Sequence, residues 1–343
     1  MELTRRGYAA AVGVVLLLVI GAGYLLLGGP GSSAQTASPS PGLTTVPTTE
    51  PNLVAPARGP APPSIGAWIG AWVKPDVPTQ DGRIKAVADF EQLIGRPLDL
   101  VNTYHSTDDF PSASDMAFVQ QGRTLMISWS GDDTRVIESG RDDAVIRQRA
   151  EEVKKLGVPI LLRWRFEMNR PNVQASIWSP ADFVAAWDHV RAIFTEVGAT
   201  NAGWVWCPLA TDFDATNAAA YYPGDSQVEW LCADVYPGPD YDSFADMADQ
   251  FMAWASKHDR PIIIGEFGAE DGDATAVQRS TWIAGVDAYA KTHPQIKALA
   301  YFEARKSENG TDRDFTLTGT TGPLGAFRTM VLDPYYHKAS GGG

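Results

Sequence analysis

Short apolar runs alternate with amphipathic stretches along the chain from Ser64 onward. Strands that are apolar on both faces and alternate with helices are typical of a parallel sheet covered by helices. Eight runs have the length of buried strands and cover residues 65–72, 98–104, 123–129, 159–165, 203–207, 228–236, 261–267 and 296–303. Eight such units in about 270 residues predict an α/β fold, a (β/α)8 TIM barrel, with an open doubly wound sheet as the alternative.

The stretches between the runs have the periodicity of helices. In residues 143–157, Val145, Ala150, Val153 and Leu156 fall on one apolar face. This stretch and residues 181–198 each end at a glycine, which is a usual helix stop. No glycine-rich phosphate loop follows the first apolar run, which disfavours a nucleotide-binding version of the fold.

The N-terminal 30 residues differ from the rest of the chain. Arg5 and Arg6 precede an uncharged, mostly apolar stretch over residues 8–27. About 20 helical residues span about 30 Å, the thickness of a bilayer core. We expect residues 1–30 to be an uncleaved signal anchor or a cleaved signal peptide, with a buried soluble helix as the remaining alternative. In both main cases the following domain is extracytoplasmic, either membrane-anchored by a single pass with a cytoplasmic N-terminus or secreted.

Residues 31–63 are rich in Pro, Ser, Thr and Ala and contain almost no aromatic residues. Such a segment buries too little apolar area to offset its ordering entropy, so we expect a disordered linker. The folded domain is then expected over residues 64–336, followed by a flexible tail over residues 337–343.

Composition narrows the function classes. The chain has 28 Lys and Arg against 41 Asp and Glu, a formal net charge of −13. This acidity disfavours a nucleic-acid binder, which needs a basic face. The 11 Trp, 11 Tyr and 13 Phe residues suit either a large core or a groove with flat stacking surfaces for sugars.

Two glutamates end buried strands in apolar surroundings. Glu167 closes the run PILLRWRFE, and Glu266 closes RPIIIGE. In a barrel, side chains at the carboxyl ends of strands four and seven face a common mouth. Paired carboxylates are what glycoside hydrolysis requires, although an ion pair of either one with Arg163 or Arg165 is the simpler structural explanation.

An ordered set of motifs accompanies these glutamates, and YYPGD-x-x-V-x-W-x-x-x-D-x-Y is the most specific of them. The others are GAWIGAW, LMISW, PILLRWRFEMN, WVWCP, PIIIGEFG and YFEARKSENGTDRDF. With these motifs the chain resembles glycoside hydrolase family 26, a β-mannanase-like family of barrel glycosidases. The resemblance covers most of residues 65–315.

The resemblance implies roles for particular residues. Glu167 would be the general acid/base, and Glu266 the nucleophile of a retaining reaction. Tyr236 would hydrogen-bond the nucleophile, and Arg163 would lie buried beneath both glutamates. Asp234 is expected to order the end of the sixth strand. Further substrate-binding or supporting candidates are Asn169, Phe166, Trp72, Trp129 and Trp206.

The chain departs from the family pattern beside the acid. The family usually has His before this glutamate, and here the residue is Phe166. An apolar ring removes a polar contact to the sugar at the cleavage site, which makes another β-linked glucan or a xylan a better substrate than mannan. The pair Asn169-Arg170 also replaces the usual Asn-Gly.

Cysteine and histidine add little chemistry. Cys207 and Cys232 lie on neighbouring strands, and a bridge and two buried thiols are equally compatible with the sequence. The five histidines are isolated, so we expect no catalytic metal and no cofactor.

The sequence thus predicts a retaining endo-β-glycosidase that acts on a mannan, a β-glucan or a xylan outside the cytoplasm. A non-hydrolytic carbohydrate-binding barrel and a transglycosylase are the alternatives. We expect a polysaccharide or oligosaccharide as partner, a membrane contact only through the N-terminal segment, no nucleic acid, and a monomer.

Overall fold

The computed structural model describes residues 50–336, except 107–109, 239, 272–273 and 309–310. The chain divides into two units, residues 1–46 and 47–343, and all described residues belong to the second unit. The expected signal segment over residues 8–27 and the expected tail over residues 337–343 lie outside the described residues. Within the described part of the chain, no helix is both long and apolar enough to cross a membrane.

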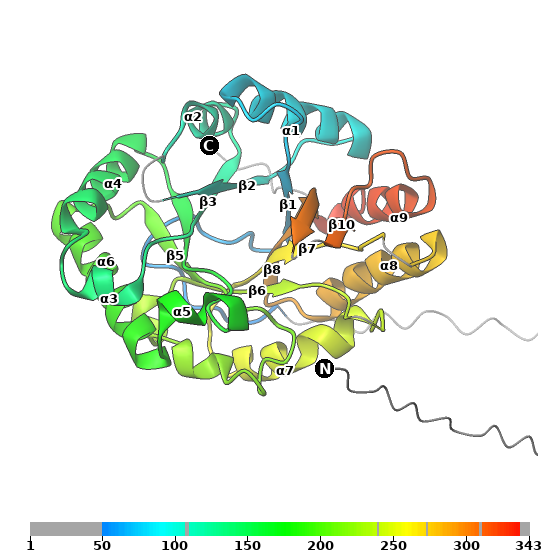
Figure 1. Ribbon diagram of the computed structural model, residues 1–343. Coiled ribbons are helices and arrows are strands. Elements are labelled where there is room, and N and C mark those ends of the chain that lie inside the picture. The colour runs from blue at the N-terminus through cyan, green and yellow to red at the C-terminus, as the bar shows by residue number, and fades with distance from the viewer. Residues whose placement is uncertain (1–49, 107–109, 239, 272–273, 309–310, 337–343) are drawn as a thin grey trace, which may run out of the picture. The chain divides into compact units, whose positions relative to one another are not determined.

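Eight parallel strands close into a barrel in sequence order, β1 to β8 (Figure 1). Their bounds are β1 Trp68–Val73, β2 Leu100–His105, β3 Thr124–Trp129, β4 Ile160–Trp164, β5 Ala202–Trp206, β6 Trp230–Val235, β7 Ile262–Phe267 and β8 Ile296–Glu303. The strand β8 pairs with β1, which completes the circle. The (β/α)8 barrel is therefore confirmed, with each strand within three residues of its predicted limits, and the open sheet is excluded.

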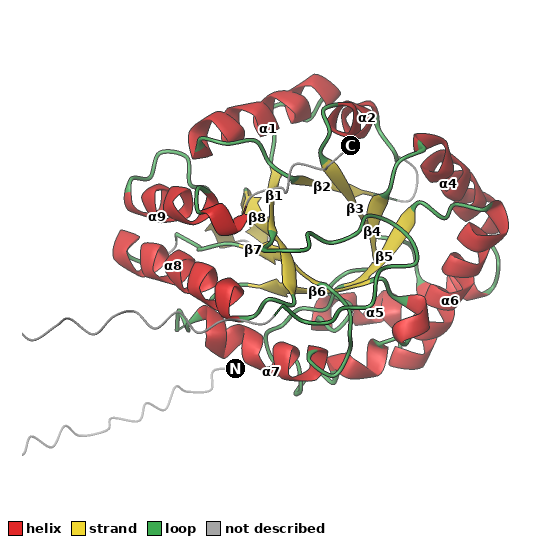
Figure 2. Cartoon of the chain, turned by 180° about the vertical axis from the view of Figure 1, so that it is seen from behind, coloured by secondary structure: helices red, strands yellow, loops and turns green. Residues whose placement is uncertain are grey.

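Helices surround the barrel as an outer layer (Figure 2). The α-helices are α1 Gln80–Ile94, α2 Ala113–Gln120, α3 Thr134–Glu138, α4 Asp143–Leu156, α5 Gln174–Ile177, α6 Pro180–Val197, α7 Phe244–Ala255, α8 Ala276–Thr292 and α9 Gly322–Val331. Short 3-10 turns are η1 Pro171–Val173, η2 Ala218–Tyr221, η3 Asp225–Gln227 and η4 Pro334–Tyr336. Helices α4 and α6 end at Gly157 and Gly198 in the left-handed conformation, as predicted.

A small antiparallel hairpin follows the last barrel strand. It pairs β9 Arg305–Glu308 with β10 Thr311–Asp314. In Figure 1 this hairpin lies in front of the barrel, so the view is onto the carboxyl ends of the strands, where barrel enzymes carry their sites.

The alternation of side chains along each strand produces two separate cores. Inward residues such as Leu161, Val205 and Ile263 form a cluster inside the barrel. Outward residues such as Leu162 and Trp164 pack against the helices in a larger cluster. Which of these two cores a residue enters is decided by its parity in the strand.

Residues 50–63 differ from the expected disordered linker. Gly59 packs against Gly203 at the start of β5, and the Trp230 indole donates to the carbonyl of Pro60 (3.3 Å). The ammonium group of Lys297 pairs with Glu50 at 2.6 Å. The folded domain therefore begins near Glu50 and not at Ser64, because this segment crosses the amino ends of the strands and covers the barrel there (Figure 2).

Candidate active site

Glu266, on β7, is held by three donors from three other strands. The Arg163 guanidinium on β4 lies 2.5 Å from Oε1, and Tyr104 on β2 donates its hydroxyl to the same oxygen. Tyr236, directly after β6, donates to Oε2 at 2.6 Å. The contact of Tyr236 with Glu266 is the one that the sequence analysis expected. Four elements thus fix one carboxylate at the mouth of the barrel.

These donors set the charge of Glu266. Burial alone raises the pKa of this carboxyl, but the charge of Arg163 and the hydrogen bonds from Arg163, Tyr104 and Tyr236 outweigh it, so the pKa is lowered. Burial, followed by the charge of Glu266, raises the pKa of both tyrosines. Both phenols therefore keep their protons and donate, and Glu266 is an anion at neutral pH.

Arg163 is fully buried and carries the network into the barrel. Its Nη1 lies 2.8 Å and 2.9 Å from the two carboxylate oxygens of Asp234, and its Nε donates to Ser128 (2.7 Å). Ser128 donates onward to the side-chain oxygen of Asn102 (2.6 Å). Burial raises the pKa of Asp234; the charge of Arg163 opposes this shift, and the charge of Glu266 adds to it. Because Asp234 is fully buried and bonded to Arg163, it holds Arg163 in place and does not face the substrate.

A glycine makes room for this network. A Cβ atom at Gly265 would lie 2.4 Å from the Cys232 sulfur, 2.8 Å from Asp234 Oδ1 and 3.0 Å from Arg163 Nη1. The strand pairing of β6 with β7 shifts between Ala233 and Asp234, which brings Asp234 opposite Glu266. The apolar motif IIIGE thus needs its glycine because charged groups pack against the strand there.

Glu167 lies in the turn after β4, in a left-handed backbone conformation with φ 53°. Its N–H donates to the carbonyl of Cys207 (2.7 Å), and its carboxylate pairs with Arg170 at 2.5 Å. One carboxylate oxygen from each of Glu167, Asp234 and Glu266 lies within 4.8 Å of the others. Glu167 is 7% exposed and Glu266 is 6% exposed, so both reach the mouth from a buried position.

The side chain of Asn169 fixes the turn that carries Glu167. The Asn169 amide donates to Leu209 O (3.0 Å) and Thr216 Oγ1 (2.9 Å), and its oxygen accepts from Leu209 N (2.9 Å). Asn169 is therefore a supporting residue whose side chain bonds within the protein.

Cys207, directly after β5, forms a disulfide with Cys232 on β6. The sequence was compatible with either a bridge or two buried thiols, and the structure has the bridge.

Aromatic rings line one side of the mouth. The Arg163 guanidinium lies 4.3 Å from the centre of the Phe166 ring. Phe166 also packs on Tyr104 (ring centres 5.6 Å apart), and Tyr104 packs on the half-buried Trp72 (5.0 Å). Phe166 thus covers the buried cation with an apolar ring, and Trp72 keeps its place as a candidate sugar contact.

Two of the expected sugar contacts are wrong. Trp129 is 1% exposed and packs on Phe110, and Trp206 is 0% exposed and donates to the carbonyl of Tyr221 (2.9 Å). Both point outward from the barrel toward the helices, because they alternate with inward residues such as Ser128 and Val205. Neither ring can reach a substrate at the mouth.

A cavity of about 430 Å³ adjoins Glu167 and Tyr236, the residue that donates to Glu266. Its lining includes Glu167, Arg170 and Tyr236, together with Glu270 and Arg313, which pair with each other at 2.5 Å. Concave sites with a few convergent polar groups are typical of small-molecule binding. Such a cavity can hold a sugar unit beside Glu167.

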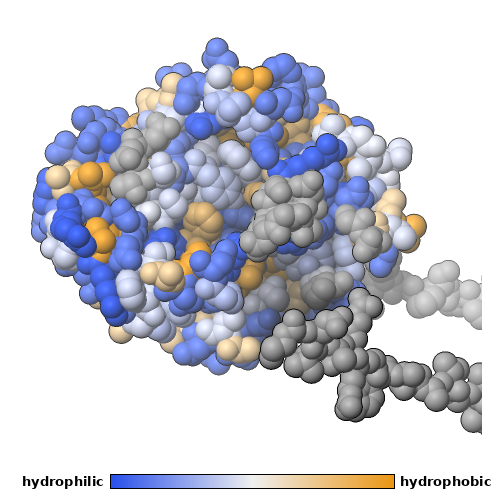
Figure 3. Space-filling view, viewed as in Figure 1, coloured by the Kyte–Doolittle hydropathy of each residue, from blue (hydrophilic) through white to orange (hydrophobic). Residues whose placement is uncertain are grey.

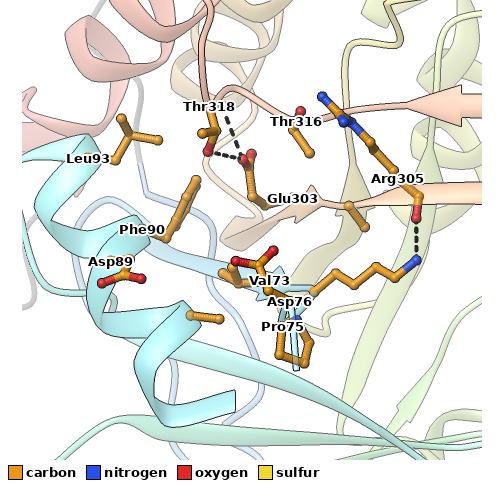
Figure 4. Close-up of a pocket in the computed structure, with 13 residues that line it drawn as sticks. Val73, Pro75, Asp76, Asp89, Phe90, Leu93, Glu303, Arg305, Thr316 and Thr318 are labelled. Atoms are coloured by element: carbon orange, nitrogen blue, oxygen red, sulfur yellow. Dashed lines mark hydrogen bonds between the residues drawn. The ribbon is translucent and has the colours of Figure 1, made fainter. Parts of the chain in front are cut away.

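A larger cavity, of about 590 Å³, lies beside α1 and the segment after β8 (Figure 4). Its buried carboxylate, Glu303, accepts hydrogen bonds from the backbone and hydroxyl of Thr318 and from Leu317 N. Glu303 therefore fixes the chain after the hairpin. Because Glu167 and Tyr236 line the smaller cavity and not this one, the smaller cavity is the candidate active site.

Sequence reasoning assigned no role to several of these residues. Tyr104 ends an apolar run, at the same height in its strand as Glu266 in β7. This shared position could have identified Tyr104 as a partner of Glu266. Arg170 was noted only as a departure from a motif. Glu270 and Arg313 lie in segments that are far apart in the sequence, and no local pattern joins them.

The chain matches the model of a known family. The match to "Glycosyl hydrolase family 26" covers residues 115–266, which include both glutamates. Endoglucanase H of Acetivibrio thermocellus is 27% identical over 290 residues, which are 78% of this chain and 30% of that protein. A beta-1,3-xylanase of Alcaligenes sp. is 23% identical over 193 residues, which are 52% of this chain and 39% of that protein. The chain thus spans about a third of the length of these relatives.

Solved structures of similar fold include two β-mannanases. The enzyme from a symbiotic protist of the termite Reticulitermes speratus has a TM-score of 0.59 at 14% identity, over 84% of this chain and 97% of that one. The enzyme from Bacteroides ovatus has a TM-score of 0.57 at 15% identity, over 79% and 89%. At this identity the likeness concerns the fold. Over residues 115–266, which include both strand-end glutamates, this chain is therefore similar to glycosyl hydrolase family 26.

Proposed function

We propose that the chain is a retaining endo-β-glycosidase that cleaves a β-linked polysaccharide by double displacement. The observation that carries the proposal is the pair of buried glutamates, which have carboxylate oxygens within 4.8 Å of each other. Retaining enzymes place their carboxyl groups about 5–5.5 Å apart, whereas inverting enzymes leave about 6.5–9.5 Å for a water molecule. The short separation favours direct attack by one carboxylate.

The surroundings of the two glutamates support different roles. Glu266 is ionised and held by Arg163, Tyr104 and Tyr236, which suits a nucleophile that must attack the anomeric carbon. Glu167 lines the cavity from a turn outside the strand and is paired with Arg170 rather than with Arg163. In the first step Glu167 gives its proton to the leaving oxygen as Glu266 forms the glycosyl ester. In the second step Glu167 takes a proton from water, which cleaves that ester.

For the substrate we propose a β-glucan, a xylan or a mannan. Two relatives are named for glucan and xylan cleavage, and two structural neighbours are mannanases. The apolar Phe166 ring over Arg163 supports a changed contact at the cleavage site and so disfavours mannan among the three.

We also propose that the domain works outside the cytoplasm. The Cys207–Cys232 disulfide supports an oxidising compartment, since such bonds are rare where thiols are kept reduced.

The mechanism is tested with Glu167→Ala and Glu266→Ala on mixed-linkage β-glucan, xylan, mannan and aryl glycosides. Glu167→Ala should lose about 10²–10⁴-fold in turnover on polysaccharide and less on aryl glycosides with a good leaving group, which need no proton. Azide should partly restore its turnover and give a β-glycosyl azide. Glu266→Ala should lose turnover on every substrate.

Glu303→Gln is the matched control, because it also alters a buried carboxylate at a strand end but lines the other cavity. It should retain turnover and show no azide effect. Identical responses of the two alanine variants, or products of inverted configuration, would remove the covalent intermediate from the proposal.

A further inference from the structure

Among the described residues, Trp178 is a large aromatic residue that lies exposed at the carboxyl end of the barrel. It is 49% exposed, directly after α5 and before the start of α6. Most of this face is hydrophilic, and apolar residues reach its surface singly or in small groups (Figure 3). A half-exposed indole loses much of the stabilisation that burial gives to Trp129 and Trp206 in the core.

The backbone at Trp178 is strained. Its φ is 64° and its ψ is −66°, a conformation that bulky residues rarely adopt. Residues held in such conformations cluster at binding sites and catalytic sites, where the surrounding structure imposes them. Here the residue in such a conformation is also half exposed.

The ring is also locked in orientation. Its Nε1–H lies 3.0 Å and 2.9 Å from the two carboxylate oxygens of Asp133, at the start of α3. The Arg135 guanidinium lies 4.2 Å from the ring centre and is itself held by Asp182 (3.1 Å). One edge and one face of the indole are therefore occupied within the protein. The exposed part of the ring is then mainly its opposite face and outer edge.

The same elements join Trp178 to the turn that carries Glu167. The Gln174 side chain, on α5, donates to Met168 O (2.7 Å) and Arg170 O (3.1 Å). Arg165 donates to both Ser176 O (3.0 Å) and Ser130 O (3.1 Å), so it ties α5 to the end of β3. The ring therefore has a fixed position relative to the acid, at the far end of η1 and α5.

We propose that Trp178 is a distal sugar-binding platform, on which a pyranose unit of the polysaccharide stacks beyond the units that lie at Glu167 and Glu266. This inference rests on the proposed function and deepens it, because it makes the enzyme selective for long chains. A rigid, flat, half-exposed indole suits the apolar face of a pyranose ring, and locking the ring in advance reduces the ordering cost of binding.

The test compares wild type with Trp178→Ala, Trp178→Phe and Asp133→Ala on a ladder of β-linked oligosaccharides and on the polymer. Trp178→Ala should raise KM for the polymer roughly 10-fold, because one stacking surface is lost. Its kcat/KM on the shortest substrates should equal that of wild type. Trp178→Phe should recover most of the polymer affinity, and Asp133→Ala should give an intermediate KM. Ile65→Ala removes an apolar side chain that is even more exposed, at the opposite end of the barrel, and should change neither value.

Binding without turnover separates this inference from the proposed function. In native gels containing mixed-linkage β-glucan, glucomannan or xylan, wild type should be retarded in one of them and Trp178→Ala less so. If wild type hydrolyses nothing but this difference in retardation appears, the proposed function fails and the platform stands. Equal retardation of both proteins, no retardation of wild type in any gel, or equal losses by Trp178→Ala on short and long substrates would overturn the platform.

Discussion

The two ends of the barrel differ in which residues adopt a backbone conformation with positive φ. In the connections that lead into β2 to β5, the positive-φ residues are the glycines Gly95, Gly122, Gly157 and Gly198. At the carboxyl end, Gly131 and Gly140 after β3 and Gly224 after β5 also have positive φ, but the connections that leave β4, β5 and β6 add six larger residues: Arg165, Glu167, Trp178, Asp212, Asn217 and Tyr241. A glycine adopts this conformation without a steric penalty, whereas each larger residue costs about 1–3 kcal/mol.

The difference shows what each end is built for. The amino end uses glycine where the chain must turn, and the segment over residues 50–63 closes it with backbone and apolar contacts. At the carboxyl end, larger residues adopt this conformation, among them Glu167, which lines the cavity, and the half-exposed Trp178. We therefore expect substitutions at the amino end to change stability alone and those at the carboxyl end to change catalysis as well.

The largest effect is expected from removing the buried arginine at each end. Arg163→Met leaves Asp234 and Glu266 without their shared cation, and Arg191→Met leaves Glu229 without its partner (2.8 Å). Uncompensated buried charge costs about 3–5 kcal/mol, so both variants should lose that much free energy of unfolding in urea titrations. Per folded molecule, only Arg163→Met should lose turnover. Equal turnover losses in both variants would contradict the separation of the two ends.

The next effect concerns the covering segment. A Cβ at Gly59, where φ is 74°, would lie 2.5 Å from the Cα and N atoms of Gly203. Gly59→Ala should therefore lower the free energy of unfolding by about 2–4 kcal/mol through strain and overpacking, with kcat unchanged. Gly122→Ala is the control, because its φ is 79° but nothing lies within 4 Å of the added Cβ. It should lose only about 1 kcal/mol. Equal losses would mean that residues 50–63 contribute no packing.

A smaller effect, on catalysis, is expected at Tyr236. A hydrogen bond to a charged group contributes about 1.5–3 kcal/mol, so Tyr236→Phe should lower kcat roughly 10- to 100-fold with little change in melting temperature. Glu266 must be ionised to attack, and its pKa is lowered, so wild-type activity should persist below the ordinary glutamate range of about pH 4.3. Loss of one donor raises the pKa of Glu266, which moves the acid limb of the pH profile upward.

Tyr301→Phe is the control for this measurement. Tyr301 is as buried as Tyr236 and donates to the carbonyl of Phe315 (2.8 Å) without touching Glu266. Its variant should keep both kcat and the acid limb of wild type. A shifted acid limb in Tyr301→Phe would show that the effect of Tyr236 is general packing.

The sequence predicted the barrel because hydrophobic periodicity is a local signal. All eight strands and the left-handed ends of α4 and α6 follow from apolar runs and glycine stops. Glu167 and Glu266 were also accessible, since a carboxylate that ends an apolar strand is conspicuous. Parity was harder to predict: Trp129 and Trp206 point outward because of one-residue differences in register that the apolar runs do not reveal.

Contacts between distant segments could not be predicted in the same way. The disulfide depends on Cys207 and Cys232 facing inward on adjacent strands, and two alternating strands allow either outcome. Residues 50–63 have the composition of a linker, yet they pack through backbone groups and glycine, which carry no hydrophobic pattern. No sequence pattern indicates that Trp178 is exposed, because a local apolar pattern does not predict the positive φ that this residue adopts.

The smallest expected effect concerns Arg170, which pairs with Glu167 at 2.5 Å where the family usually has glycine. A cation beside a carboxylate favours the ionised form, and the acid must be protonated for the first step. Arg170→Gln should therefore extend activity to higher pH, with the alkaline limb of the profile moving upward. The acid limb, which belongs to Glu266, should not move. Arg170→Lys keeps the charge and should retain the wild-type profile. If Arg170→Gln instead moved the acid limb, the roles of the two glutamates would be exchanged: Glu167, in the turn after β4, would be the nucleophile, and Glu266, within β7, would be the acid.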